Sequence, residues 1–174
     1  MHREFRKPLI LIWSKSLLRH PLARSNKEDF VEGKFFRRVI DDPEVEDKTN
    51  IKRLILCSGQ VFATLFKARE ENEIKDTAIV RLEQLHPFPW QKLKDVVNSY
   101  PNLTDFVWTQ EEPMNAGAYS YVSPRLETLF KETNYPDAHV RYAGRNPSAA
   151  VAAGVKRVHI AQEKAFIKQA LELE

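Results

Sequence analysis

Short, continuous apolar runs alternate along this chain with stretches of helical periodicity, and this alternation constrains the fold more than any other feature. Five runs have the length of a buried strand: residues 9–13, 53–57, 77–82, 105–109 and 140–143. A strand that is covered on both faces reads as a continuous apolar run, because neither face is left for polar residues. We therefore predict an α/β fold in three layers, with a mostly parallel sheet of about five strands and helices on both of its faces.

Apolar residues at helical spacing occupy the segments that follow these strands. The expected buried faces consist of Val61, Phe62, Leu65 and Phe66, then Trp90, Leu93, Val97 and Tyr100, then Leu126, Leu129 and Phe130, and finally Ile160, Ile167, Ala170 and Leu171. Ser123 and Pro124 are typical of the first turn of a helix, and the last helix is expected to begin near Val155. We also expect a short helix capped by Ser25 and an acidic surface loop over residues 41–50.

The composition is that of a soluble globular protein. With 174 residues, of which 43% are hydrophobic and 29% are charged, the chain can build one core, and we expect residues 1–174 to form a single domain. No apolar run approaches the roughly 20 residues of a membrane-spanning helix. The 27 Lys and Arg residues and the 24 Asp and Glu residues are interleaved. We therefore expect neither a membrane nor a nucleic acid as a partner.

The residue types that usually carry catalysis are not grouped in this sequence. Cys57 ends an apolar run, where a thiol is usually an inert core residue and not a nucleophile. The histidines show no pairing at metal-ligand spacing; they are His2, His20, His86, His139 and His159. Residues Ser58 and Gly59 indicate an ordinary turn, because no glycine-rich phosphate loop surrounds them. We therefore expect no catalytic residue and no metal site within the chain.

Basic and hydroxyl side chains follow the first apolar run. Ligands of open α/β sheets bind beyond the carboxyl ends of the strands, so this position is a candidate site. Ser14, Lys15, Ser16, Arg19 and His20 offer donors that can hold an anion at the start of a short helix. The alternative interpretation is a helix cap that is followed by solvated basic residues.

Polar residues also follow the later runs. Arg145 comes after the fifth run and can bind a carboxylate or a phosphate with two parallel hydrogen bonds, although an interface salt bridge requires the same residue type. Adjacent carboxylates after the fourth run usually point in different directions, which favours structural roles over acid/base chemistry. The residues expected to have structural or interface roles are Glu83, Gln110, Glu111, Glu112, Asn115 and Arg125.

Five motifs resemble, in the same order, the carboxy-terminal domain of 2-oxoglutarate dehydrogenases. They are residues 8–21, 53–61, 81–89, 108–117 and 141–150. The motifs reach almost from one end of the chain to the other, which makes the resemblance specific. The amino-acid sequences of residues 21–26 and 121–126 are most similar to those of fungal mitochondrial members. Trp13 and Thr109 depart from the residue types of many relatives.

The resemblance implies a transketolase-type carboxy-terminal domain of a longer, homodimeric enzyme. In this family thiamine diphosphate and magnesium lie between two preceding domains of partner subunits, so this fragment is expected to bind neither, and Met1 is expected to be internal to a longer chain. The full enzyme decarboxylates 2-oxoglutarate in the tricarboxylic acid cycle and passes the succinyl unit to the lipoyl group of a succinyltransferase component. Its location is the mitochondrial matrix, or the cytoplasm for a bacterial source.

The leading hypothesis is that the chain stabilises the dimer and packs against the preceding domains without turnover of its own. A second hypothesis is a regulatory site for an acyl-CoA or a nucleotide, formed by Lys15, Ser16, Arg19, His20 and Arg145, because some relatives are thought to be controlled in this region. A further alternative is that the parent enzyme is a paralogue that prefers 2-oxoadipate over 2-oxoglutarate. A free-standing flavodoxin-like electron carrier is supported by topology alone.

Overall fold

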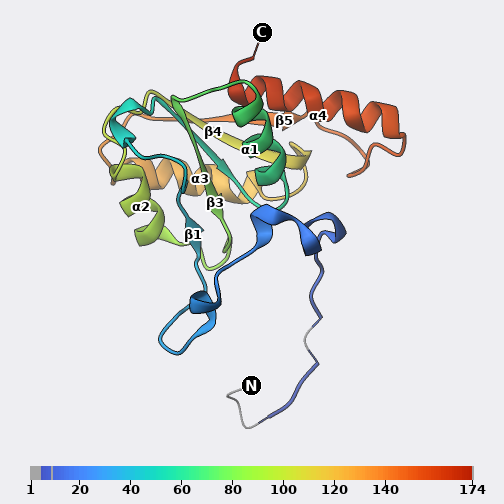
Figure 1. Ribbon diagram of the computed structural model, residues 1–174. Helices are drawn as coiled ribbons and strands as arrows, with labels where there is room; N and C mark the ends of the chain where they lie inside the picture. The colour runs from blue at the N-terminus through green and yellow to red at the C-terminus, as the bar shows by residue number, and fades with distance from the viewer. Residues whose placement is uncertain (1–4, 9, 174) are drawn as a thin grey trace. The chain divides into compact units, whose positions relative to one another are not determined.

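The computed structural model describes residues 5–8 and 10–173, and the chain divides into two compact units, Met1–Lys34 and Phe35–Glu174. In its described residues the smaller unit contains three 3-10 helices, η1 Lys15–Arg19, η2 Pro21–Ala23 and η3 Lys27–Phe30. The larger unit contains the sheet and the α-helices (Figure 1). The expectation that all residues form a single domain stays a prediction.

The strand predicted at residues 9–13 is wrong for the part that the structure describes. Residues 10–13 have no regular secondary structure, and Leu9 lies outside the described residues. Ile10 is 84% exposed and Ile12 is 96% exposed. Apolar composition predicts that a segment needs burial, but it does not report which neighbour supplies the hydrogen bonds of a strand. The short helix that was expected to have Ser25 as its cap is η3, and its cap is Asn26.

The sheet has five strands in the order β1-β3-β2-β4-β5. The bounds are Val39–Ile40 for β1, Arg53–Cys57 for β2, Thr77–Leu82 for β3, Asp105–Pro113 for β4 and Val140–Arg145 for β5. The pairs β3–β2, β2–β4 and β4–β5 are parallel, whereas β1 pairs antiparallel with β3. The prediction of a mostly parallel sheet is therefore confirmed, and the short edge strand β1 takes the place of the strand expected at residues 9–13.

Four α-helices cover the two faces of the sheet (Figure 1). Their bounds are Val61–Glu71 for α1, Trp90–Asn98 for α2, Tyr119–Phe130 for α3 and Lys156–Leu171 for α4, and a 3-10 helix, η4, spans Lys48–Asn50. Helix α1 packs with α4, and α2 packs with α3. Alternate residues of β2 and β4, such as Leu56 and Trp108, join the core with α2 and α3. The predicted arrangement in three layers is confirmed.

Helix α3 begins at Tyr119, five residues before Pro124, the predicted first helical residue. The side-chain Oε1 of Gln110 accepts a hydrogen bond from the backbone N–H of Tyr119 at 2.9 Å, which satisfies one of the unpaired donors at the start of the helix. The additional turn buries Val122 completely. Pro124 therefore lies inside the helix.

Two residues predicted to face the core are instead exposed. Trp90 is 44% exposed at the first position of α2, where its ring packs at 4.7 Å, centroid to centroid, against Phe88. Ile160 is 39% exposed. It lies two turns before the buried Ile167 on the same side of α4, but the amino-terminal half of α4 extends beyond α1 (Figure 1). Phe166 fills the core position that the sequence pattern did not identify.

Candidate functional site

The carboxyl ends of β2 and β4 form the topological switch point of the sheet. The chain leaves β2 toward β3 on one side and leaves β4 toward β5 on the other, which is the arrangement that places ligands in many α/β folds. Here the Nε2 of Gln60, from the loop after β2, donates to both carboxylate oxygens of Glu111 on β4, at 2.8 and 2.7 Å. The switch point is thus spanned by an amide–carboxylate pair.

Cys57 ends β2 at this edge and is fully buried. Burial raises the pKa of its thiol far above the ordinary value, because the thiolate would lose its hydration. A thiol that stays protonated at neutral pH is a poor nucleophile. Cys57 therefore contributes packing to the core and no reactive group.

Gln110 is the most highly hydrogen-bonded side chain at this edge. It is 2% exposed, and its Oε1 accepts from the indole Nε1 of Trp108 and from the backbone N–H of Tyr119, each at 2.9 Å. Its Nε2 donates to the carbonyls of Ala116 at 2.7 Å, Pro113 at 3.1 Å and Glu112 at 3.3 Å. One buried amide thereby fixes the end of β4, the following turn and the start of α3.

The remaining polar residues near β4 and β5 also contact the backbone. The amide of Asn115 forms two hydrogen bonds with the backbone of Ser148, at 2.9 and 3.0 Å, and so joins the loop after β4 to the loop after β5. The backbone carbonyl of Glu112 accepts from the hydroxyl of Tyr142 at 3.2 Å. For this tyrosine, burial followed by the nearby Glu112 charge raises the pKa to about 12.

Glu83 and Arg125 lie apart from this group. Glu83 follows β3, with its carboxylate 3.6 Å from the guanidinium of Arg81. Arg125 on α3 donates to the carbonyl of Tyr121 at 2.7 Å and stacks on the ring of the same residue at 3.6 Å. These contacts are local, so the structure shows no site that these two residues share with Gln110.

Arg145 differs from Arg69, the other buried arginine among the described residues. It is only 7% exposed at the end of β5, and its Nη2 lies 2.7 Å from the Nδ1 of His159 on α4. Its Nε is buried without a hydrogen-bond partner. Sequence reasoning identified Arg145 by its place after a strand but missed His159, because nothing in the spacing of the two residues shows that they meet.

The basic residues after the first run lie in the smaller unit and are described there alone. The hydroxyls of Ser14 and Ser16 are 2.7 Å apart, and Lys15 and Arg19 are the first and last residues of η1. The Nδ1 of His20 accepts from the backbone N–H of Leu22 at 3.2 Å and caps η2. A joint acyl-CoA or nucleotide site with Arg145 stays a prediction, because Arg145 belongs to the other unit.

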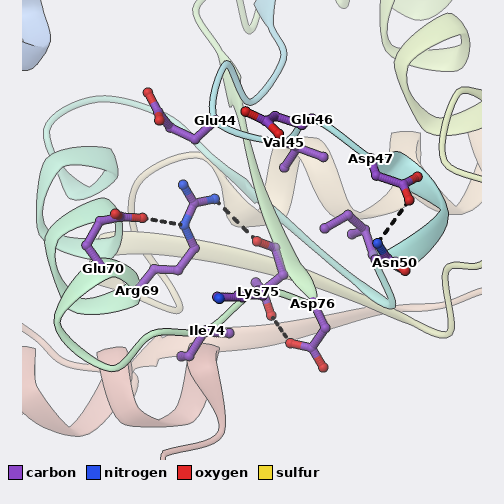
Figure 2. Close-up of a pocket in the computed structure, with 12 residues that line it drawn as sticks. Glu44, Val45, Glu46, Asp47, Asn50, Arg69, Glu70, Ile74, Lys75 and Asp76 are labelled. Carbon is purple, nitrogen blue, oxygen red and sulfur yellow. Dashed lines mark hydrogen bonds and ion pairs between the residues drawn. The ribbon is translucent and has the colours of Figure 1, made fainter.

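A pocket of about 500 Å³ opens at the opposite, amino end of β2 and β3 (Figure 2). Carboxylates dominate its lining, which consists of Glu44, Val45, Glu46, Asp47, Asn50, Ile51, Arg69, Glu70, Ile74, Lys75, Asp76 and Thr77. Hydrogen bonds from the side chain and the backbone of Thr49 lower the pKa of Asp47. Sequence reasoning missed this pocket, because only the tertiary fold brings the loop over residues 44–51 to the end of α1.

The sequence predicted that the acidic loop over residues 41–50 lies at the surface, but one of its carboxylates is buried. Asp42 is 4% exposed, and its carboxylate is paired with the guanidinium of Arg69, which is 3% exposed. The same carboxylate accepts from the backbone N–H of Ile79 on β3 at 2.7 Å. A buried carboxylate requires such partners, and here they tie the loop to α1 and to the sheet.

A family model described as "2-oxoglutarate dehydrogenase C-terminal" matches residues 24–171. The chain belongs to the 2-oxoglutarate dehydrogenase C-terminal family. The matched range contains every strand and α-helix of the described residues, so the family match and the sheet with its covering helices coincide.

Curated relatives match this member of the 2-oxoglutarate dehydrogenase C-terminal family over nearly its whole length. The protein named "2-oxoglutarate dehydrogenase, mitochondrial" from Saccharomyces cerevisiae is 54% identical over 176 residues, which cover 98% of this chain. Its namesake from Schizosaccharomyces pombe is 49% identical over 98% of the chain. A Dictyostelium discoideum protein, "Probable 2-oxoadipate dehydrogenase complex component E1 homolog", is 41% identical over 91% of the chain. The chain spans 17% of the length of each of these relatives.

The described residues of this 2-oxoglutarate dehydrogenase C-terminal family member contain neither a metal-binding cluster nor a membrane-spanning helix. Within residues 5–8 and 10–173, no three His, Cys, Asp or Glu side chains are grouped so as to hold a metal ion. In the same part of the chain, no helix has the length and the apolar character that crossing a membrane requires. Among the described residues, the buried side-chain polar atoms without a hydrogen-bond partner are the hydroxyl of Thr109 and the Nε of Arg145.

Proposed function

We propose that this chain is the carboxy-terminal part of a mitochondrial 2-oxoglutarate dehydrogenase. In that enzyme it supports the dimer and the oxidative decarboxylation of 2-oxoglutarate, with succinyl transfer to lipoyl groups, and it holds no catalytic group itself. The observation that carries the proposal is the filled switch point, where Gln60, Glu111 and Gln110 use their polar atoms on each other and on the backbone. The names of the two fungal relatives support both the reaction and the location.

Exposed apolar side chains support a docking role toward preceding domains of the same enzyme. Large exposed apolar patches mark interaction surfaces, because each such side chain gains about 25 cal/mol per Å² when a partner covers it. Among the described residues of the unit Met1–Lys34, the large apolar side chains that are at least half exposed are Phe5, Ile10, Leu11, Ile12, Trp13, Leu18, Phe30 and Val31. Since the relatives are far longer than this chain, a neighbouring domain can provide the cover.

The cofactors of the family, thiamine diphosphate and magnesium, are assigned to the preceding domains of the enzyme. The described residues of this chain contain no group of three His, Cys, Asp or Glu side chains that could hold a metal ion, so they do not fit that role. We assign this chain no step of the cofactor's chemistry. The lipoyl succinyltransferase component and a second subunit are the proposed partners of the whole enzyme.

Substitution of an exposed apolar residue tests the docking role in the full-length enzyme. Ile12→Glu places a charge at a side chain that is 96% exposed. We expect the variant to lose dimer content in sedimentation and to lose decarboxylation in proportion. Lys27→Glu, at an exposed position of the same unit, is the matched control and is expected to retain both. If Ile12→Glu stays dimeric and active, this surface does not dock on a neighbouring domain.

The preferred oxo acid is tested on the same full-length enzyme. The two fungal relatives carry the name of a 2-oxoglutarate dehydrogenase. The Dictyostelium relative carries the name of a 2-oxoadipate enzyme and is less similar. We expect kcat/KM to be higher for 2-oxoglutarate than for 2-oxoadipate when both are measured with thiamine diphosphate and magnesium present. The opposite ranking would assign the chain to a 2-oxoadipate enzyme.

A further inference from the structure

Arg145 is a buried cation without a counterion in the described part of the chain. A guanidinium stays charged at every physiological pH, and its burial is unfavourable unless an anion or a full set of hydrogen-bond acceptors replaces water. Arg145 is 7% exposed, its Nε has no acceptor, and its one hydrogen bond is to the ring of His159. A group that is not part of the described residues is therefore needed to complete the site.

Three other arginines, on α1, β2 and β5, show what such a site normally contains. Arg69, which is as buried as Arg145, is paired with the carboxylate of Asp42. Arg53 and Arg141 both contact the carboxylate of Asp105, at 2.6 and 2.8 Å. In this domain a shielded guanidinium is thus matched with an anion, and Arg145 is the exception among these four.

His159 orients Arg145 but adds no negative charge. Because a guanidinium can only donate hydrogen bonds, the Nδ1 of His159 must accept from Nη2. The ring proton then lies on Nε2. The contact fixes the direction of the guanidinium toward the first turn of α4, where His159 is located.

The amino end of α4 adds further positive potential. Its cap residue, Val155, has no side chain that can accept from the free backbone N–H groups, and its first turn contains no acidic residue. Lys156 and Arg157 occupy the first two helical positions. An uncapped helix start combined with cations is a favourable place for a phosphate, because the amides and the helix dipole both stabilise negative charge.

The backbone around this site is held in place. Arg145 is the last residue of β5, and the loop that leads to α4 is anchored where Asn115 forms two hydrogen bonds with Ser148. Preorganised donors bind an anion more tightly than mobile ones, because less conformational entropy is lost on binding.

We propose that Arg145, the first turn of α4 and the side chains of Lys156 and Arg157 bind a phosphate group, either of a phosphorylated small molecule or of inorganic phosphate. Three positive charges and a helix start match a doubly charged phosphate better than a singly charged carboxylate. All of these residues belong to the unit Phe35–Glu174, so the inference stands apart from the proposed function of the whole enzyme.

Equilibrium dialysis with radiolabelled inorganic phosphate tests the site in the full-length enzyme. Saturation with thiamine diphosphate and magnesium fills the cofactor's own phosphate site before the measurement. Competition with glycerol 2-phosphate distinguishes a phosphate ester from inorganic phosphate as the better ligand, and acetate at equal ionic strength probes a carboxylate. We expect about one phosphate per chain, with a Kd in the millimolar range or below.

Variants assign the binding to the proposed residues. Arg145→Met is expected to weaken phosphate binding by at least about tenfold, because two charge-assisted hydrogen bonds are lost. Arg145→Lys keeps the charge without the planar fork, so it serves if the methionine variant does not fold, and it is expected to bind several-fold more weakly than the parent. Arg157→Gln, at an exposed position, is expected to weaken binding about threefold. Lys67→Gln removes a charge at another exposed position, on α1, and is expected to bind like the parent.

Three results would overturn the proposal. The first is an enzyme that binds no phosphate beyond the cofactor site at millimolar concentrations. The second is unchanged binding in Arg145→Met and Arg145→Lys, which would locate the anion elsewhere. The third is displacement of phosphate by acetate at equal concentration, which would make the site a receptor for a carboxylate.

Discussion

The carboxylate of Asp42 and the guanidinium of Arg69 form an ion pair whose side chains are 0% and 4% exposed, between the loop before β2 and the last turn of α1. The pair also accepts from the backbone N–H of Ile79 and donates to the carbonyl of Thr77. Three segments, the loop before β2, the last turn of α1 and strand β3, therefore meet at one buried contact. Removal of either partner leaves the other charge buried without compensation.

Asp42→Asn is expected to lower the free energy of unfolding by about 3–5 kcal/mol, as for other broken buried ion pairs. The double variant Asp42→Asn with Arg69→Met removes both charges and is expected to recover part of that loss. Chemical denaturation of the chain measures all three proteins. Glu44→Gln, on the exposed part of the same loop, is the control and is expected to change stability by less than about 0.5 kcal/mol. A small effect of Asp42→Asn would contradict the structural role of the pair.

Gln110→Glu tests the amide that organises the end of β4. The substitution keeps the shape of the side chain but replaces the donating nitrogen with an oxygen that faces the carbonyls of Pro113 and Ala116. We expect a loss of about 3 kcal/mol in the free energy of unfolding, because a buried carboxylate would face acceptors. Glu111→Gln, at the half-buried next position of β4, is expected to cost far less. Equal stability of both variants would show that the buried amide is not essential.

Thr109→Val is expected to stabilise the protein by about 1 kcal/mol. The hydroxyl of Thr109 is buried without a hydrogen-bond partner, next to Cys57 on the neighbouring strand. Valine fills nearly the same volume and removes the desolvated polar atom. Thermal unfolding of the two proteins decides the question, and a lower midpoint for the valine variant would indicate that the hydroxyl has a partner in solution.

We expect the folded protein to lose stability in acid, because the carboxylate of Asp105 is paired with arginines. Burial alone would raise the pKa of Asp105, but hydrogen bonds from Arg141 and Arg53 outweigh it and hold the pKa below the ordinary value. A carboxyl whose pKa is lower in the folded state stabilises the protein above its unfolded pKa of about 3.9, and this contribution is lost as the pH falls through the folded value.

Asp105→Asn is accordingly expected to be less stable than the parent at pH 7 by about 1–2 kcal/mol. The difference should shrink toward pH 2, because the parent carboxyl is then protonated too. Unfolding free energies measured across this range provide the comparison. A difference that does not depend on pH would mean that packing, and not charge, explains the effect.

The sequence predicted those elements whose environment is encoded locally. Strands β2 and β3 begin and end at the predicted residues, because burial on both faces makes most positions of the strand apolar. The run at residues 10–13 has the same composition but no strand partner among the described residues of its unit. Strand β1 has only two residues, Val39 and Ile40, too few for a recognisable pattern.

The candidate site follows the same rule. Arg145 could be identified because its position after a strand is visible in the sequence, whereas His159 and the start of α4 reach it only through the fold. Asp42 and Arg69 are separated by 27 residues, and an acidic loop gives no sign that one carboxylate points inward. Contacts between distant segments are set by tertiary packing, which periodicity does not report.

The most direct test of the central claim, that this chain supports an enzyme without catalytic groups of its own, is a turnover assay of the purified 174-residue chain with 2-oxoglutarate, thiamine diphosphate and magnesium. Carbon dioxide release is measured beside the full-length enzyme at equal molar concentration. The filled switch point predicts release no faster than the buffer control, while the full-length enzyme turns over. Decarboxylation by the isolated chain above that control would contradict the account.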